Sequence, residues 1–150
     1  MTVATYDNLQ LSNQLCFALY AATNAITRAY RVRLGPLGLT YPQFLVLLVL
    51  WQGGAHTVKS LADALQLDSS TLTPLLKRLQ AAGWVSRRRD DADERVVRIV
   101  LTPEGRALRR PVSVIQKEVT CLTLMTTPNF DRLRRELSDL ATSLASNTVA

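Results

Sequence analysis

One two-faced helix constrains the fold of this chain more than any other feature of its sequence. Leu72, Leu75, Leu76 and Leu79 recur at helical spacing, so one side of a helix over residues 70–82 must face a core. The other side carries small hydroxyl groups near its start and cations further along. These residues are Ser70, Thr71, Thr73, Lys77 and Arg78.

A shorter helix and a turn precede this helix. Residues 58–65 predict the short helix, and residues 66–69 the turn. A short helix, a tight turn and a second helix with such a polar face are typical of a helix-turn-helix, whose second helix enters the major groove of DNA. An ordinary surface helix with a solvated polar face would show the same stripe, so the interpretation depends on the residues C-terminal to this helix.

A two-stranded ribbon with an acidic tip is predicted over residues 84–101. Val97, Ile99 and Leu101 alternate with period two, as on one face of a strand. Acids at residues 90–94 would repel phosphate, so the basic residues beside them are expected to contact DNA. These are Arg87, Arg88, Arg89 and Arg95, with Asp93 placed to orient the Arg95 guanidinium. An arginine at a hairpin tip suits the minor groove.

The positive charge of the chain is concentrated in the same region. Between Lys77 and Arg110 there are ten Lys or Arg and five Asp or Glu, which accounts for +5 of the formal charge of +6. A positive field on one element indicates a polyanionic partner rather than general solubility. Double-stranded DNA is therefore the expected partner.

Metal and hydrolytic chemistry have few residues to use in this sequence. The two cysteines, Cys16 and Cys121, are too few and too far apart for a zinc site. The single histidine, His56, lies in a Gly-Gly-Ala-His segment and is expected to be a solvated loop residue. We therefore expect that the protein binds no metal and no cofactor, and that it is not an enzyme.

No membrane segment is expected either. The longest apolar run, residues 44–51, is far too short to span a bilayer, and the N-terminus lacks the pattern of a signal peptide. A cytoplasmic location is the default expectation.

Helices are predicted on both sides of the central module. No Gly or Pro interrupts residues 9–34, which predict one long helix. Thr40 or Tyr41 caps an apolar helix that ends near residue 51, with Pro42 in its first turn. A further helix begins at Thr102, with a kink or second start at Pro111. It is expected to run to residue 125, and a last helix to begin at residue 130.

These elements predict a mainly α fold with a small β-hairpin wing, in other words a winged helix-turn-helix. We expect residues 1–150 to form one domain, with residues 41–102 as the DNA-binding module. The apolar faces of residues 9–34 and 103–147 need more cover than this small module provides, so these helices are expected to form a homodimer. A two-fold dimer would present two reading helices about one DNA turn apart, to a pseudo-palindromic operator.

Several blocks of the sequence resemble one known family. The segment Asp93-Glu94-Arg95 followed by residues 101–105 resembles the wing and exit of MarR-family repressors. Residues 14–20, 39–47 and 67–79 resemble, more narrowly, the organic-hydroperoxide sensors of its OhrR subfamily. The likeness covers nearly the whole chain, with the blocks in order.

The resemblance implies a redox role for both cysteines. Cys16 matches the peroxide-reactive cysteine of that subfamily, and Cys121 matches the resolving cysteine of its two-cysteine branch. Oxidation of Cys16 by an organic hydroperoxide to a sulfenic acid, then a disulfide with Cys121 of the other subunit, would release the repressor from its operator. From the residues alone, either cysteine could equally be a small core residue on an apolar helix.

Three tyrosines are candidates for supporting a Cys16 thiolate. Tyr20 lies one helical turn from Cys16, whereas Tyr30 lies about 21 Å further along the same helix. Tyr30 therefore cannot serve its own Cys16, but could serve the partner's if the long helices cross in a dimer. Tyr41 is a further candidate. Phenol groups that donate to sulfur favour the reactive thiolate.

Two other functions remain open on the sequence alone. A repressor of the same family could be relieved by a small aromatic ligand instead of by a peroxide. A thiol peroxidase, with Cys16 as peroxidatic and Cys121 as resolving residue, would belong to a different class of protein.

Overall fold

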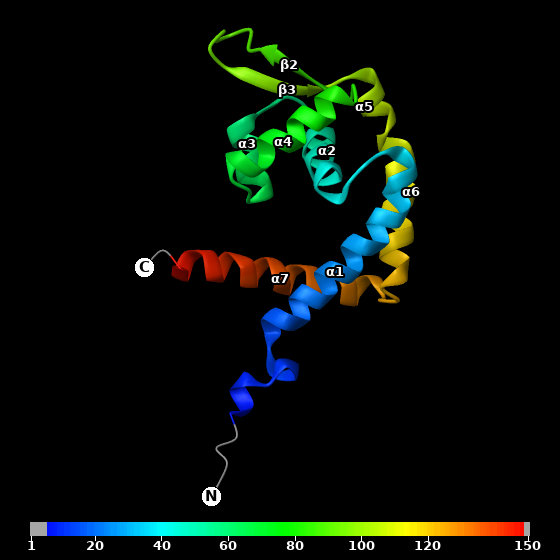
Figure 1. Ribbon diagram of the computed structural model, residues 1–150, viewed down its shortest axis with the longest axis vertical. Coiled ribbons are helices and arrows are strands. Elements are labelled where there is room, and N and C mark those ends of the chain that lie inside the picture. The colour runs from blue at the N-terminus through cyan, green and yellow to red at the C-terminus, as the bar shows by residue number, and fades with distance from the viewer. Residues whose placement is uncertain (1–5, 149–150) are drawn as a thin grey trace, which may run out of the picture. The chain divides into compact units, whose positions relative to one another are not determined.

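The computed structural model describes residues 6–148, and it is mainly helical with a small three-stranded sheet (Figure 1). The chain divides into two compact units, Met1–Gln116 and Lys117–Ala150. The predicted fold class, helical with a β-hairpin wing, is confirmed.

The first unit begins with two short turns and a long helix. The turns are η1 (Asp7–Leu9) and η2 (Leu11–Asn13), and helix α1 spans Leu15–Leu34. The prediction that this helix begins at residue 9 is therefore wrong. Gln10 and Gln14 adopt extended backbone conformations, and the Gln14 side-chain amide donates to the carbonyls of Asn8 and Gln10. Such side-chain bonds compete with helix formation.

Helix α2 (Tyr41–Gly53) follows the turn η3 (Gly35–Leu37) and supplies much of the core. The Gln43 side chain accepts hydrogen bonds from the Thr40 amide at 2.9 Å and the Thr40 hydroxyl at 3.0 Å, so Thr40 is the cap. Phe44, Val46, Leu47 and Leu50 are buried. An apolar helix with one buried, bonded amide is what a central helix requires.

Helices α3 (Val58–Leu65) and α4 (Ser69–Ala81) form the predicted helix-turn-helix. The Thr57 hydroxyl accepts from the Ser60 amide at 3.0 Å and caps α3. Gln66 ends that helix in the left-handed conformation, with φ 53°. Leu72, Leu76 and Leu79 are buried, so the predicted apolar face of α4 is confirmed.

The sheet has the order β1–β3–β2, with both pairs antiparallel. Its strands are β1 (His56–Thr57), β2 (Val85–Arg89) and β3 (Val97–Leu101). Strand β1 was not predicted, because two residues carry no periodicity. His56 is consequently not a solvated loop residue: it pairs with Ile99, is half-buried, and its Nδ1 lies 3.1 Å from the Ser60 hydroxyl.

The first turn of helix α5 (Pro103–Ala107) packs closely against Trp84, the residue before β2. The Thr102 hydroxyl caps it by accepting from the Gly105 amide at 3.0 Å, and the Thr102 amide donates to the Trp84 carbonyl at 3.1 Å. A Cβ on Gly105 would clash with that carbonyl oxygen. The Trp51 indole N–H donates to the Gly105 carbonyl at 3.0 Å, which ties α2 to α5.

A second helix start was predicted near Pro111, and helix α6 (Arg109–Leu122) begins there. The helix includes the last residues of the first unit and the first residues of the second. It ends at Leu122, not at residue 125. The amides of Thr123 and Leu124 bond three residues back, and Leu124 is left-handed with φ 55°. These bonds tighten the last turn and end the helix.

Helix α7 (Thr127–Thr148) makes up most of the second unit. It begins three residues earlier than predicted, because Pro128 fits the first turn of a helix. The Phe130 amide donates to the Thr126 carbonyl at 2.9 Å.

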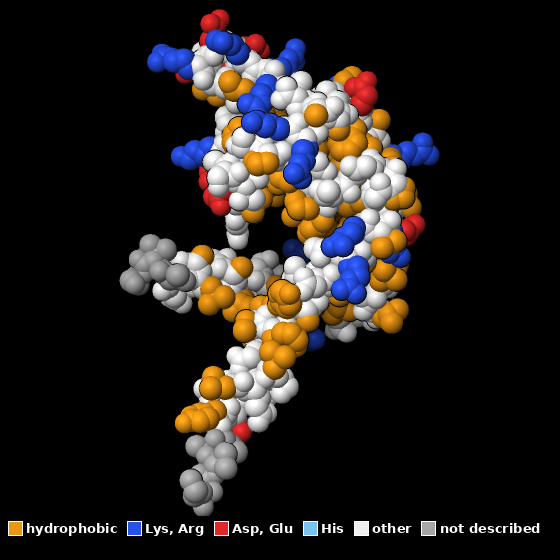
Figure 2. All heavy atoms as spheres, viewed as in Figure 1, with side chains coloured by type: hydrophobic (Ala, Val, Ile, Leu, Met, Phe, Trp, Pro, Cys, Tyr) orange, Lys and Arg blue, Asp and Glu red, His pale blue; other side chains and the backbone are white. Residues whose placement is uncertain are grey.

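Large apolar side chains are exposed on the N-terminal segment and α1, and on the helices of the second unit. Figure 2 shows hydrophobic side chains gathered over α1 and the turns before it. On this segment they are Leu9, Leu11, Leu15, Phe17, Tyr20, Ile26 and Val32, and in the second unit Leu122, Leu124, Met125, Leu133, Leu137 and Leu144. Apolar surface of this extent marks a contact with another molecule.

Among residues 6–148 no single helix is long and apolar enough to cross a membrane; only the bent pair Leu15–Leu37 with Tyr41–Gly53 meets the criteria of length and composition.

The close approach at Gly105 gives a test of the fold. We expect Gly105→Ala to lower the free energy of unfolding by about 1 to 3 kcal/mol, because the added Cβ forces α5 away from the Trp84 carbonyl. Urea unfolding at a fixed protein concentration measures this. Gly35→Ala is the matched control, since Gly35 is helical and nothing lies within 4 Å of its added Cβ. Equal stability of the two variants would contradict the tight packing of this junction.

Candidate nucleic-acid interface and cysteine sites

Asp68 organises the start of α4. Its carboxylate accepts from the Thr71 amide at 2.7 Å and from the Ser70 hydroxyl. These hydrogen bonds, led by that of Ser70, hold the pKa of Asp68 below its usual value. The carboxylate therefore stays charged at neutral pH and caps the helix by satisfying a free amide.

The polar face of α4 is open to solvent. Ser70, Thr71, Lys77 and Arg78 are exposed, whereas Thr73 is half-buried and donates its hydroxyl hydrogen to the Ser69 carbonyl at 2.7 Å. All five predicted residues lie on this one helix, opposite its buried leucines. The Ser70 hydroxyl donates its hydrogen to the Asp68 carboxylate, and the Thr73 hydroxyl donates to the Ser69 carbonyl. Toward a nucleic acid, both hydroxyl oxygens are therefore acceptors.

The wing separates two arginines that were predicted to act together. Arg88 pairs with Arg98, and Ser86 with Val100, in the β2–β3 register. Successive side chains of a strand point to opposite faces, so Arg87 and Arg88 lie on opposite faces of the wing. Ser86, Arg88 and Val100 instead line one cavity. The alternation of residues along β2 was a signal in the sequence that would have revealed this.

Asp90 holds the wing tip together, a role that the sequence did not suggest. Its carboxylate accepts from the amides of Ala92 at 2.9 Å and Asp93 at 3.3 Å, and it forms an ion pair with Arg98. The Arg98 hydrogen bond is the main cause that lowers the pKa of Asp90. Because folding lowers the pKa of Asp90, its hydrogen bonds and ion pair stabilise the folded state at neutral pH. This stabilisation is lost only as the pH falls through the folded-state pKa of Asp90.

Arg95 projects from the tip as predicted. Its side chain is 95% exposed, and its Nε lies 3.6 Å from the Asp93 carboxylate. The same carboxylate accepts from the Arg95 amide at 3.0 Å. Asp93 thus fixes the backbone of Arg95 more firmly than its guanidinium.

The two cysteines are free thiols, and both are exposed. Cys16 is the second residue of α1, and Cys121 lies near the end of α6. The thiolate is the nucleophilic form of cysteine, and an exposed thiol is accessible for such chemistry.

Tyr30 and Tyr41 lie together in one subunit, beside Phe44. Their ring centroids are 5.1 Å apart, and each ring also contacts that of Phe44. Burial raises the pKa of both phenols, and the charge of Tyr41 adds to the effect on Tyr30. Both groups therefore remain neutral hydrogen-bond donors. Tyr20, in contrast, is exposed.

Within residues 6–148 no group of three or more His, Cys, Asp or Glu side chains is placed to hold a metal ion.

Several known proteins are similar to this chain. Residues 39–97 match the model of the MarR family. The HTH-type transcriptional regulator TtmR of Methylorubrum extorquens is 50% identical over 135 residues, which is 90% of this chain and 68% of TtmR. The organic hydroperoxide resistance transcriptional regulator of Bacillus subtilis is 40% identical over 139 residues, 93% of this chain and 95% of the regulator.

Solved structures agree with these relatives. AbfR of Staphylococcus epidermidis is similar in fold, and reduced AbfR bound to DNA aligns over 94% of this chain and 96% of that chain, with a TM-score of 0.76 and 32% identity. Disulfide-formed AbfR aligns over 96% of each chain, with a TM-score of 0.64 and 33% identity. The relatives are transcriptional regulators rather than enzymes, and the chain belongs to the MarR family.

Proposed function

We propose that this chain is a redox-sensing transcriptional repressor. It binds a pseudo-palindromic operator as a homodimer and leaves the DNA when an organic hydroperoxide oxidises Cys16. One observation carries the proposal: an exposed thiol lies in the first turn of α1 in a chain that is 40% identical, over 93% of its length, to a regulator of organic hydroperoxide resistance.

The exposed faces of α4 and the wing support DNA as the partner. Lys77 and Arg78 are exposed on α4, and Arg95 is almost fully exposed at the wing tip. A helix with this polar face fits the major groove, and a tip arginine fits the minor groove. Reduced AbfR, which shares the fold, is described bound to DNA.

The exposed apolar side chains support a homodimer. On α1 and the turns before it, Leu9, Leu15 and Val32 are each more than 60% exposed. Covering them with the same segments of a second copy would remove this surface from water, at about 25 cal/mol per Å². Two copies related by a two-fold axis would then present two α4 helices to one DNA duplex.

The chemistry starts from the thiolate of Cys16. It attacks the outer oxygen of the hydroperoxide and the O–O bond breaks, so the hydroxyl group stays on sulfur as a sulfenic acid. The leaving alkoxide takes a proton from water and departs as the alcohol. The thiol of Cys121 from the partner then attacks that sulfur, and water leaves as the disulfide forms. Disulfide-formed AbfR is a precedent for such a product in a similar fold.

Tyr30 and Tyr41 are proposed to donate hydrogen bonds to the sulfur of the partner's Cys16. They are adjacent neutral donors, and Tyr30 lies too far along α1 to reach the Cys16 of its own chain. Tyr20, one turn from Cys16, is the candidate from the same chain.

A disulfide would then change the spacing of the two reading helices, so that they no longer match the operator.

Replacing the sensing cysteine tests this proposal. We expect Cys16→Ser to bind DNA within about twofold of wild type, and to stay bound when cumene hydroperoxide is added. Fluorescence anisotropy measures both properties, with a duplex selected by the reduced wild-type protein from a random pool. Cys121→Ser is the matched control: its Cys16 should still be oxidised, which mass spectrometry detects. Peroxide-induced release of the Cys16→Ser variant would refute the sensor assignment.

The wing tip gives a separate test of the DNA interface. Asp90→Asn and Asp91→Asn remove the same charge from neighbouring residues, but only Asp90 holds the tip. We expect Asp90→Asn to weaken DNA binding about tenfold, whereas Asp91→Asn binds at least as tightly as wild type. Tighter binding by both variants would mean that simple charge, not the order of the wing, governs affinity.

The tyrosine pair gives a third test. Tyr41→Phe removes one donor and keeps the ring packing with Tyr30 and Phe44, so we expect a slower reaction of Cys16 with cumene hydroperoxide, by about tenfold. Stopped-flow measurement of thiol loss in the Cys121→Ser background monitors this step. Tyr6→Phe, at an exposed tyrosine outside the cluster, is the control. An unchanged rate in both Tyr41→Phe and Tyr30→Phe would remove these phenols from the mechanism.

A further inference from the structure

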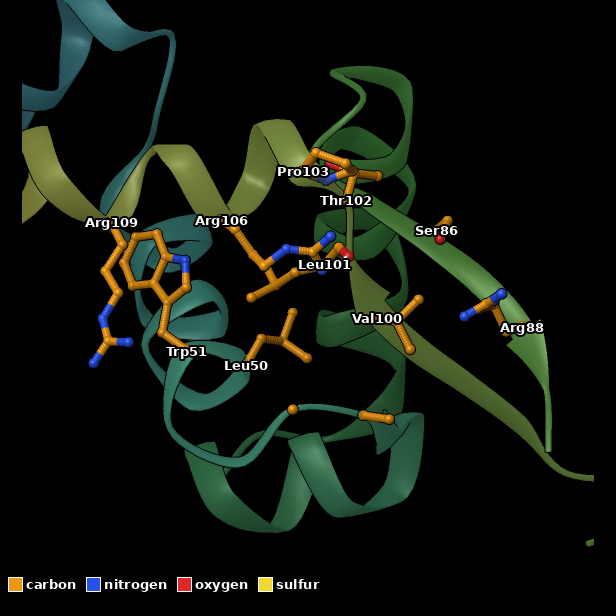
Figure 3. A pocket seen from close by; sticks show the side chains of 12 residues that line it. Leu50, Trp51, Ser86, Arg88, Val100, Leu101, Thr102, Pro103, Arg106 and Arg109 are labelled. Carbon is orange, nitrogen blue, oxygen red and sulfur yellow. Dashed lines mark hydrogen bonds between the residues drawn. The ribbon is translucent and has the colours of Figure 1, made fainter. Parts of the chain in front are cut away.

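A cavity of about 800 Å³ lies on the outer face of the wing, within the first unit. It is bounded by the end of α2, by β2 and β3, and by α5 and the start of α6. In Figure 3, Leu50, Leu101 and Val100 lie between Trp51 and Arg109 on one side and Ser86 and Arg88 on the other. The volume is in the range of small-molecule sites, which is about 300 to 1,000 Å³.

The cavity is lined by charge of one sign. Arg88 comes from β2, Arg106 from α5 and Arg109 from the first residue of α6, and none of the 12 lining residues, all of them in the described part of the chain, is acidic. Three guanidinium groups from three elements place positive charge around one cavity, which favours an anion there. Arginine also offers paired N–H groups, which match the oxygens of phosphate.

Two walls of the cavity are held in place by hydrogen bonds. Arg106 donates from Nη1 to the Leu101 carbonyl at 2.8 Å, and the Trp51 indole donates to the Gly105 carbonyl at 3.0 Å. The indole and the side chains of Leu50 and Val100 add apolar surface beside the cations. A planar ring could pack on this surface while its charged groups reach the arginines.

The proposed DNA contacts leave this cavity unexplained. Arg88 lies on the opposite face of β2 from Arg87, and the reading residues of α4 do not line the cavity. We propose that the cavity binds a phosphorylated ring compound of the nucleotide type, through Arg88, Arg106 and Arg109. Three cations call for a ligand with more than one negative charge, which a monocarboxylate does not carry.

Calorimetric titration of the reduced full chain, without DNA, tests this site. ATP is the probe, with pyrophosphate for the phosphates alone and benzoate for a ring with one charge. We expect saturable binding of ATP, weaker binding of pyrophosphate, and at least tenfold weaker binding of benzoate. Absence of saturable heat with ATP, or benzoate binding as tightly as ATP, would overturn the proposal. Because no DNA is present, this outcome is independent of the proposed function.

Matched variants locate the bound anion. Arg88→Gln is expected to weaken ATP binding about tenfold, whereas Arg28→Gln, at an exposed position of α1 outside the cavity, stays within twofold. Lys77→Gln distinguishes this cavity from the polar face of α4. Equal losses in Arg88→Gln and Arg28→Gln would indicate nonspecific attraction, and a greater loss in Lys77→Gln would place ATP on α4; either result overturns the site.

Discussion

The contact of Gly105 with Trp84 and Trp51 is the constraint on which the arrangement of the first unit depends. The missing side chain lets α5 approach the Trp84 carbonyl, and the indole of Trp51 closes the contact from α2 at 3.0 Å. Three elements therefore meet at one junction: the wing, α2, and α5, which is followed by the helix that carries Cys121. A change of direction at α5 is expected to disturb the wing, because the nearest atoms at this contact are backbone atoms of Trp84, which cannot rotate away as a side chain can.

The elements that sequence predicts best are those with strong periodicity and capping. The leucine stripe of α4, the helix start at Thr102 and the alternating strand over residues 97–101 all match the structure. Weak or nonlocal signals explain the differences. The side-chain amide of Gln14 bonds to the carbonyls of Asn8 and Gln10 where the first turns of α1 were expected, and the two-residue strand at His56 depends on pairing with Ile99.

The residues of the candidate site also divide into those that the sequence predicts and those that it does not. The exposed position of Lys77 and Arg78 is predicted by helical spacing, and the alternation of β2 already separates Arg87 from Arg88. The pair Asp90–Arg98 was not predictable, since acids at a hairpin tip look only like a solvated turn until the strand register brings the arginine beside them. Apolar helix faces in the sequence indicate that a partner covers them, but not which residues meet across the contact. The tyrosine–cysteine pairing therefore rests on helix geometry and resemblance.

In the proposed mechanism, different parts of the chain hold the DNA and trigger its release. Helix α4 and the wing bind the DNA, and oxidation of Cys16 releases it. Cys16 lies fourteen residues before Tyr30 on α1. The most direct test monitors release of DNA and loss of the Cys16 thiol in the same wild-type sample, after one equivalent of cumene hydroperoxide per subunit. The mechanism predicts that thiol loss comes first and that the released fraction of dimers never exceeds the fraction in which at least one Cys16 is oxidised. Release of DNA while Cys16 remains a thiol would contradict it.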